Sequence, residues 1–507
     1  MGRVRSVGRA ESVVDMRRSY RQSGKENRAT STAIPLTSQP LELLIAISHG
    51  AEQKLGPQIE RQIRAAVRAG TLRPGAPIPS TRDLAAQLRV SRPIVVDAYA
   101  QLAAEGYLTL RQGARPRVSA SAPSAAARAP IGARGEPRAR YDFLPAVPDL
   151  SAFPRAAWLA ATRDALSKMP DAELGYRDPH GCEVLRGALA EYLGRVRGVV
   201  CDAEQIVITS GFAQGRALVC RALVAKGAKR LAVEDPGYSE WRAIVAAGLK
   251  LAPIALDDSG MRVDALERAN VDAVLVTPVH QFPTGIVMSG ERRTALLAWL
   301  RARGAIAIED DYDAEFRYDR APVGALQSLE PERVIYCGTA SKTLAPALRL
   351  GWLVVPHHLV DALHVEHLLA DYGVSRIEQH TLAGMFASGE LNRHLRRMRI
   401  RYRARRDALI DALAAEMPEA EVRGIAAGLH ATVVLSGDDD ERAILEESRR
   451  RGIALEVLGQ HRIVPREGRA TLLLGYARMP EATMRVAVRE LRDAIRSARS
   501  TAASRIG

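Results

Sequence analysis

Short apolar runs alternate with longer amphipathic stretches from Tyr141 onward, and this alternation limits the fold more than any other feature of the chain. Strands that alternate with helices assemble into a mainly parallel sheet covered by helices, so the pattern predicts an α/β domain over residues 141–500. The expected strands are Ile206–Thr209, Leu231–Val233, Ala273–Val276, Ala305–Ile308, Val334–Cys337 and Trp352–Val355. Long helical stretches follow Pro356, and a mixed region, Ala431–Ser497, predicts a small C-terminal α+β lobe.

A Ser-Lys pair stands between the last two expected strands, in the segment Gly338–Trp352 that reads GTASKTLAPALRLGW. Burial of an ammonium group costs several kcal/mol unless the charge is paired or neutralised. Lys342 is therefore predicted to be kept for the chemistry of its amine.

Positive charge is concentrated ahead of this domain. The formal net charge is +14, and residues 1–140 contain 23 Lys and Arg against 10 Asp and Glu, which leaves 49 against 48 for the remainder. A basic N-terminal segment on a neutral body indicates a module that binds a polyanion. A basic disordered tail is the alternative that charge alone leaves open.

Helical spacing within residues 41–118 favours a folded module. A first amphipathic helix has an apolar residue at every fourth position, at Ile59, Ile63 and Val67. Ser80 and Asp83 form a capping box at the start of a second helix. After a break at residues 89–90, Ser91 is expected to cap a third helix that ends at Gly106. Segments 107–110 and 116–119, on either side of the turn RQGA, predict a two-stranded wing.

Polar side chains of this module are predicted to contact DNA. Helix N-termini favour phosphate, because they present free N–H groups and the positive end of the helix dipole. A lone exposed arginine is usually a solvated surface residue, so the prediction depends on the whole set. The predicted contacts are Ser80, Arg82, Ser91, Arg92, Arg111 and Arg115, with Arg117 also in the wing.

The stretch LRPGAPIPSTRDLAAQLRVSRPIVVDAYAQLAAEGYL resembles the winged helix of GntR-family regulators. The resemblance implies that the helix over 91–105 enters the major groove of operator DNA. The wing reads RQGARPRV, where the family usually has a Gly-Ser-Gly-Thr tip. Residues 1–40 lack periodicity and predict a disordered extension, and residues 119–140 predict a basic linker.

Four further motifs follow expected strands of the body, at the edge where open α/β sheets bind ligands. They are ITSGFAQ at 208–214, EDPGY at 234–238, TPVHQFPTG at 277–285 and IEDDYDAEFRY at 308–318. Each alone has an ordinary explanation, such as a strand turn or a solvated acidic turn. Together with Lys342 they offer an amine for a Schiff base, a carboxylate for a pyridine nitrogen, a phenol for a ring oxygen and donors for a phosphate. These are the requirements of pyridoxal 5'-phosphate.

The order of these motifs resembles fold type I aminotransferases, and with the winged helix the chain is similar to MocR/GabR-like regulators over about residues 45–495. The resemblance implies a homodimer with sites built across two chains. It implies that Lys342 forms the Schiff base, that Asp310 pairs with the pyridine nitrogen and that Tyr312 meets the ring hydroxyl. The other implied contacts are ring stacking by Tyr238, phosphate binding by Gly211, Phe212, Ser341 and Arg349, and a phosphate contact from the partner chain by Tyr176.

Three positions depart from the aminotransferase pattern. Phe282 replaces the Asn that precedes Pro-Thr-Gly in plain aminotransferases, as is usual in the regulators. Aminotransferases commonly bind the substrate carboxylate with an Arg at the position of Leu473. GABA-responsive regulators have an Arg at the position of Glu240. These differences argue against a GABA-like effector and leave Arg478 or Arg462 for a carboxylate.

The leading hypothesis is a pyridoxal-phosphate-dependent transcriptional regulator that binds operator DNA and senses an amino compound or the cofactor itself. One alternative is an active aminotransferase with an accessory DNA-binding head. Another is a DNA-binding protein whose body holds no cofactor. The resemblance implies at most residual transaminase activity for the leading hypothesis.

Neither a disulfide framework nor a metal site is predicted. The four cysteines lack CxxC spacing, and the histidines have no metal-ligand spacing. No apolar run approaches the ~18 residues of a membrane span, and the basic N-terminus lacks the apolar centre of a signal peptide. A cytoplasmic protein is expected.

Overall fold

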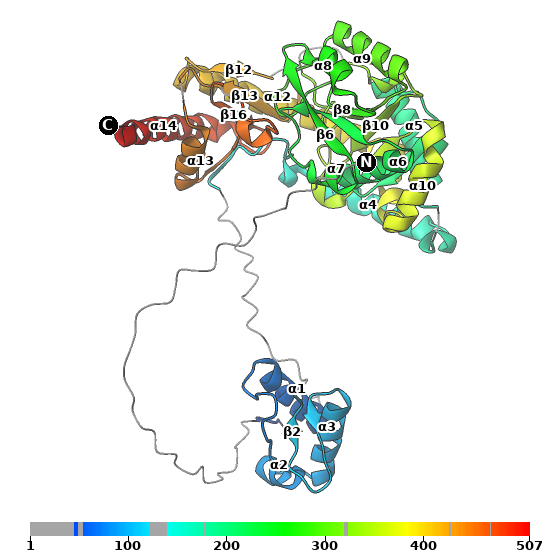
Figure 1. The fold of residues 1–507 in the computed structure, drawn as a ribbon, viewed down its shortest axis with the longest axis vertical. Coiled ribbons are helices and arrows are strands. Elements are labelled where there is room, and N and C mark those ends of the chain that lie inside the picture. Colours follow the sequence, from blue (N-terminus) through cyan, green and yellow to red (C-terminus); the bar gives the residue numbers. More distant parts are fainter. Residues whose placement is uncertain are drawn as a thin grey trace, which may run out of the picture. The chain divides into compact units, whose positions relative to one another are not determined.

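The computed structural model describes residues 45–48, 54–120, 139–176, 178–318, 323–424, 427–437, 439–466 and 468–506. The chain divides into two compact units, one up to Arg134 and one from Gly135 onward. Figure 1 draws the N-terminal unit in blue and the larger unit in the remaining colours. The predicted extension 1–40 and most of the predicted linker 119–140 lie outside the described residues.

The described residues of the N-terminal unit form three helices and a two-stranded wing. They are α1 (Leu55–Arg68), α2 (Thr81–Leu88), α3 (Arg92–Ala104), β1 (Leu108–Thr109) and β2 (Arg117–Val118). The unit has its own apolar core, in which Ile59, Ile63 and Leu102 are fully buried. The predicted winged helix-turn-helix is confirmed.

The turn between α2 and α3 corrects one prediction. The Ser80 hydroxyl accepts a hydrogen bond from the Asp83 N–H at 3.2 Å, as expected for a helix start. Ser91 occupies the same position before α3, but its hydroxyl does not cap that helix. Pro93 has no N–H to donate, and the Ile94 N–H bonds the Ser91 carbonyl at 3.1 Å instead. Among the described residues the Ser91 hydroxyl has no hydrogen bond.

An eight-stranded sheet forms the centre of the larger unit, in the order β4-β11-β10-β9-β8-β5-β6-β7. The strands are β4 (Ile206–Thr209), β5 (Arg230–Asp235), β6 (Lys250–Asp257), β7 (Gly260–Met261), β8 (Ala273–Val276), β9 (Ile306–Asp310), β10 (Val334–Thr339) and β11 (Gly351–Val354). The strands from β10 to β6 run parallel, whereas β11 is antiparallel to both of its neighbours and β7 is antiparallel to β6. The prediction of a mainly parallel sheet is confirmed.

Helices cover both faces of this sheet because successive strand residues point to opposite sides. Leu231 and Val233 of β5 pack with α6 (Gly211–Ala225) and α10 (His357–Ala370). Ala232, between them, packs on the opposite face with α8 (Val263–Ala269) and α9 (Gly290–Arg303). Other helices of this part are α4 (Arg155–Lys168), α5 (Glu183–Arg197), α7 (Arg242–Ala246) and α11 (Arg376–Ala387).

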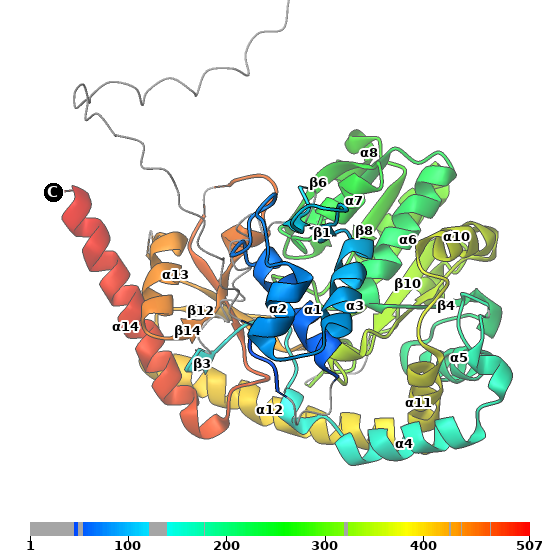
Figure 2. The same cartoon turned by 90° about the horizontal axis from the view of Figure 1, so that it is seen from below.

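A smaller C-terminal lobe contains a four-stranded antiparallel sheet in the order β12-β13-β16-β15. Its elements are α12 (Glu390–Glu416), β12 (Glu421–Arg423), β13 (His430–Val434), α13 (Glu441–Arg450), β15 (Glu456–Val457), β16 (Thr471–Gly475) and α14 (Glu481–Ile506). Strand β14 (Ile453–Ala454) pairs with β3 (Tyr141–Asp142). Glu416 forms ion pairs with Arg485, Arg489 and Arg492, which hold α12 beside α14 (Figure 2).

Among the described residues, none of the helices combines the length and apolar character that a membrane span needs.

Candidate functional site

Most of the predicted cofactor residues line one cavity of about 220 Å³ in the larger unit. The cavity lies where several strands end: β9 ends at Asp310, β10 ends three residues before Lys342, and α6 begins two residues after β4. Of the predicted residues, its walls contain Phe212, Tyr238, Asp310, Tyr312, Ser341, Lys342 and Arg349. The fold thus gathers motifs that are dispersed along the sequence.

Lys342 and Asp310 face this cavity without a direct partner among the described residues. Burial lowers the pKa of Lys342, although the carboxylates of Asp313 and Asp310 oppose that effect. Burial, followed by the charge of Asp311, raises the pKa of Asp310 to about 8, against the effects of Arg216 and Lys342. Burial therefore makes the Lys342 amine easier to deprotonate than a lysine in water, and a cation near Asp310 would stabilise its carboxylate.

An anion cradle lies at the N-terminus of α6. Gly211 begins the helix with φ 76°, and an added Cβ there would lie 3.3 Å from Arg349 Nη1. Arg349 Nη2 donates a hydrogen bond to the Ser210 carbonyl at 2.6 Å. Ser341 is held by the Thr339 hydroxyl, which accepts its backbone N–H at 3.1 Å. A helix N-terminus, a guanidinium and a hydroxyl together form a suitable phosphate site.

Glycines bring three chain segments into backbone contact beneath this cradle. A Cβ on Gly351, at the start of β11, would lie 3.0 Å from Gly211 Cα and 3.2 Å from the Gly338 carbonyl oxygen. A Cβ on Gly338, in β10, would collide with the indole of Trp352. Side chains larger than hydrogen are therefore excluded at these positions.

Aromatic rings form one wall of the cavity. Tyr238 lies 6.3 Å from Phe212 and 6.4 Å from Phe282, and Phe282 meets Tyr312 edge to face at 6.1 Å, measured between ring centroids. The guanidinium carbon of Arg216 lies 5.1 Å from the centroid of Tyr238. Arg216 was not predicted, although an arginine within the apolar run RALVCRALVA of α6 was a signal of a special environment, and its side chain is buried.

Buried polar side chains lie next to the Tyr312 hydroxyl. The Tyr312 hydroxyl lies 3.0 Å from His280 Nδ1, and the same nitrogen lies 2.9 Å from an Asp313 carboxylate oxygen. His430 Nε2 lies 3.1 Å from the Pro283 carbonyl, and burial together with His280 lowers the pKa of His430 to about 3. The Tyr312 hydroxyl is therefore held by the buried His280–Asp313 pair, while the residue lines the cavity.

Tyr176 does not line this cavity. Its side chain is 95% exposed, and its ring centroid lies 5.9 Å from that of Tyr372. The contact expected from a partner chain therefore stays a prediction. Arg478 pairs with Asp142 at 2.7 Å, and Arg462 lines a separate cavity of about 580 Å³, so neither carboxylate candidate reaches the cofactor cavity.

The predicted DNA contacts lie on α2, α3 and the wing of the N-terminal unit. The side chains of Arg82, Arg92, Arg111 and Arg115 are exposed, and Ser80 is half-buried at its helix start. Arg117 donates to the Gly75 carbonyl at 2.9 Å, which holds it against the unit itself. The structure provides the exposed cations, and their contact with DNA stays a prediction.

Two families match the two units. Residues 55–118 match the bacterial regulatory proteins of the gntR family, and residues 147–491 match aminotransferase class I and II. Fold and cavity thus define a DNA-binding regulator with an aminotransferase-like body. The multiple substrate aminotransferase of Thermococcus profundus is similar in structure, with a TM-score of 0.66 and 26% identity, over 72% of this chain and 93% of that one.

Two curated relatives match across both units. The HTH-type pyridoxine biosynthesis transcriptional regulator PdxR of Corynebacterium glutamicum is 35% identical over 90% of this chain and 99% of its own. The probable rhizopine catabolism regulatory protein MocR of Rhizobium meliloti is 30% identical over 91% and 97%, respectively. The chain therefore belongs to the MocR-type transcriptional regulators of the GntR family.

Proposed function

We propose that this regulator binds pyridoxal 5'-phosphate in its body and that the ligand state of the body sets its affinity for operator DNA. One observation carries the proposal: a single cavity is lined by the Lys342 amine, by the Asp310 carboxylate, which has no hydrogen-bond partner among the described residues, and by Arg349, which lies against Gly211. The chemistry of these donors matches an aldehyde, a pyridine nitrogen and a phosphate, respectively.

Each group of the cofactor has a proposed partner. When bound, the cofactor would supply an electron-withdrawing aldehyde that can join to an amine. Lys342 would provide that amine, Asp310 would hold a proton on the pyridine nitrogen, and Tyr312 would meet the ring oxygen. Tyr238 would stack on the ring. The phosphate would lie among Gly211, Phe212, Ser341 and Arg349, with Tyr176 of a partner chain.

The cavity favours the cofactor itself as the sensed ligand. Lys342 and Arg349 are the cations among its described lining residues, and both are assigned to the cofactor. Leu473 is fully buried in β16 and Glu240 is exposed, so neither supplies a cation for the carboxylate of an amino acid. The relative named for pyridoxine biosynthesis supports the same choice. An amino compound without a carboxylate is the second candidate.

The N-terminal unit would bind the operator through α3 and the wing. The proposed contacts are Ser80, Arg82, Ser91, Arg92, Arg111 and Arg115, in a cytoplasmic homodimer that recognises paired half-sites. The proposed division into residues 41–118 for this unit, 119–140 for a linker and 141–500 for the body follows from the sequence. Among the described residues, neither the Ser91 hydroxyl nor the guanidinium of Arg82 has a hydrogen-bond partner, which supports their assignment to phosphate.

A binding assay on the DNA beside its own coding region tests the proposal. We expect pyridoxal phosphate to change the affinity of the full-length protein for that DNA about tenfold, whereas Lys342→Ala should bind DNA with no response. A response of Lys342→Ala equal to that of the wild type would refute the sensor. Rapid turnover of an amino donor and a keto acid, without any effect on DNA affinity, would favour the aminotransferase alternative.

A further inference from the structure

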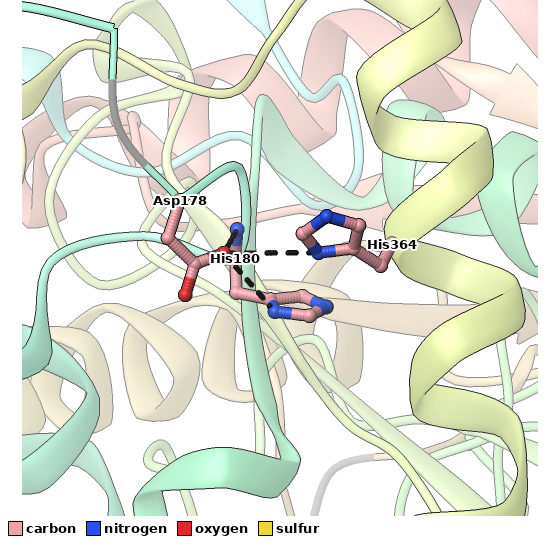
Figure 3. Close-up of side chains that lie close together, drawn as sticks. All are labelled: Asp178, His180 and His364. Carbon is pink, nitrogen blue, oxygen red and sulfur yellow. Dashed lines mark hydrogen bonds and ion pairs between the residues drawn. The ribbon is translucent and has the colours of Figure 1, made fainter.

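Three potential metal ligands meet on the larger unit at a place that does not line the cofactor cavity. Asp178 and His180 lie in the loop before α5, and His364 projects from α10 toward them (Figure 3). One ligand atom from each residue lies within 4.8 Å of the other two. Residue spacing gave no sign of this site, because His364 is far from the other two residues in the sequence.

The distances in this cluster suit a small cation. Asp178 Oδ1 lies 3.2 Å from His180 Nδ1 and 3.8 Å from His364 Nδ1. Ligand atoms about 2.0–2.2 Å from a tetrahedral zinc ion are roughly 3.3–3.6 Å from one another. The observed separations bracket this range. The side chain of His364 is 36% exposed, so it has the freedom to move the small distance that remains.

The two imidazoles lie next to each other at the carboxylate. The ring centroids of His180 and His364 are 4.7 Å apart, in an edge-on arrangement. An imidazole nitrogen offers a lone pair to a metal, so a cation between the rings and the carboxylate could be bound by all three side chains.

Neighbouring residues hold the Asp178 carboxylate in position. Its Oδ1 also accepts the backbone N–H of His180 at 2.9 Å, and Arg186 lies 3.6 Å from Oδ2. Arg376 donates to the Asp178 backbone carbonyl at 2.6 Å. Outer contacts of this kind orient the ligands of metal sites. The carboxylate side chain itself is 44% exposed, which leaves an entry path and space for a water ligand.

We propose that Asp178, His180 and His364 bind one divalent transition-metal ion per chain, of the class represented by Zn²⁺. Two imidazoles and one carboxylate suit this class, whereas Mg²⁺ and Ca²⁺ prefer all-oxygen sites. Three protein ligands leave a fourth position for water. This inference does not depend on the proposed function, because none of the three residues is assigned to the cofactor or to DNA.

The ion would fasten a loop to a helix. His180 is already joined to β4, since its carbonyl accepts the Ile208 N–H at 2.7 Å. A bound metal would add a link from this loop to α10 through His364. Tyr176 lies two residues before Asp178, so the ion would also restrict the segment that presents this exposed tyrosine.

Zinc binding by the untagged, full-length protein tests the site. We expect equilibrium dialysis with elemental analysis to give one Zn²⁺ per chain, and competition with a chromophoric chelator to give its affinity. His364→Ala should weaken that affinity by tenfold or more, since even the loss of an outer contact costs about that much. His358→Ala is the matched control, because His358 is an exposed histidine on the same helix and should leave the affinity unchanged.

A second variant and a second ion keep the test independent of folding. Asp178→Asn preserves the shape of its side chain and should also weaken zinc binding, with an unchanged circular dichroism spectrum. Co²⁺ should bind with visible bands that His364→Ala abolishes, and excess Mg²⁺ should not displace it. Absence of stoichiometric zinc would overturn the proposal. Full zinc affinity in both variants would also overturn it, and would point to another cluster such as His280, Asp313 and His430.

Discussion

At the residue scale, the run of acids from 309 to 313 separates into structural carboxylates and one that is available to a ligand. The Glu309 carboxylate accepts the backbone N–H groups of Leu326 and Gln327. Asp311 pairs with Arg197 at 2.7 Å, and Asp313 lies against His280. Asp310 has no such partner among the described residues. The sequence shows that four acidic residues lie close together, but only the fold shows which three of them have hydrogen-bond or ion-pair partners.

The pKa of Asp310 leads to a prediction about pH and stability in the cofactor-free protein. The pKa of Asp310 rises from 3.8 to about 8 in the fold, because burial disfavours its charged form. The contribution of its protonated side chain to the free energy of unfolding is therefore fully present below pH ~4 and is lost as the pH rises through about 8. The slope is at most ~1.4 kcal/mol per pH unit. The unfolding temperature is measured by calorimetry between pH 5 and 8.5. As the pH rises, the unfolding temperature of Asp310→Asn should fall less steeply than that of the wild type.

Glu309→Gln provides the control for this experiment. The pKa of Glu309 is also raised, to about 7, but its partners are backbone groups outside the cofactor cavity. In excess pyridoxal phosphate, the unfolding temperatures of the wild type and Asp310→Asn should depend on pH with the same slope. The slope of Glu309→Gln should still differ from that of the wild type. Parallel pH profiles for the wild type and Asp310→Asn would contradict the assignment.

At the element scale, the strands at the centre of the sheet were the most predictable, because their residues are continuously apolar. Strand β6 was missed. It reads KLAPIALD, and Pro253 lacks the N–H that a paired strand normally donates. The sheet accommodates it because β6 pairs with β5 along this stretch and meets β7 only at Leu256 and Asp257. Local sequence patterns thus predict most strands. Whether a strand can contain a proline such as Pro253 depends on how it pairs with its neighbours, which the local pattern does not show.

The two ends of α6 allow a matched test of the phosphate cradle. Gly211 and Gly227 both have positive φ, 76° and 96°, but a Cβ would contact Arg349 only at Gly211, and nothing lies within 4 Å at Gly227. Either Gly→Ala change should cost about 1–2 kcal/mol of stability. Only Gly211→Ala should lower the affinity for pyridoxal phosphate, by about tenfold, in an absorbance titration. An equal loss in both variants would indicate a general effect of strain.

The start of α3 permits a test of DNA contact. Arg92→Ala should weaken operator binding and reduce the slope of log affinity against log salt concentration by about one. Arg61→Ala removes the same charge from an exposed position on α1 and should change the slope little. Fluorescence anisotropy at several salt concentrations distinguishes the two. Equal effects would mean that the charge of the unit matters and the position of Arg92 does not.

At the scale of the whole molecule, the chain divides where its composition and charge change. The basic head has a core of its own, and the nearly neutral body holds the cofactor cavity. Charge and periodicity in the sequence predicted a basic head and a neutral body, and the chain forms two compact units, although the exact boundaries stay a prediction. The contact predicted for Tyr176 also stays a prediction, because its ligand would belong to a second chain and its own side chain is exposed.

Mixed dimers can show whether Tyr176 acts across the subunit boundary. Tyr176→Phe should weaken binding of the cofactor in its homodimer, and Lys342→Ala should abolish covalent binding. A heterodimer of the two variants would keep one intact site if Tyr176 serves the partner chain, and absorbance titration should then give half occupancy at wild-type affinity. Half occupancy at the weakened affinity would place Tyr176 in its own chain. Tyr372 lies beside Tyr176, so Tyr372→Phe is the control. This variant should bind pyridoxal phosphate with wild-type affinity.

The glycine contacts beneath the cradle restrict how a ligand can deform the body. The backbone approaches at Gly211, Gly338 and Gly351 leave little room for one of these segments to shift past another. The segment that carries Tyr238 is instead connected to the C-terminal lobe, because the Ile463 N–H donates to the Asp235 carboxylate and the Gly237 N–H donates to the His461 carbonyl. A ligand that displaced Tyr238 would therefore act on that lobe sooner than on the central sheet.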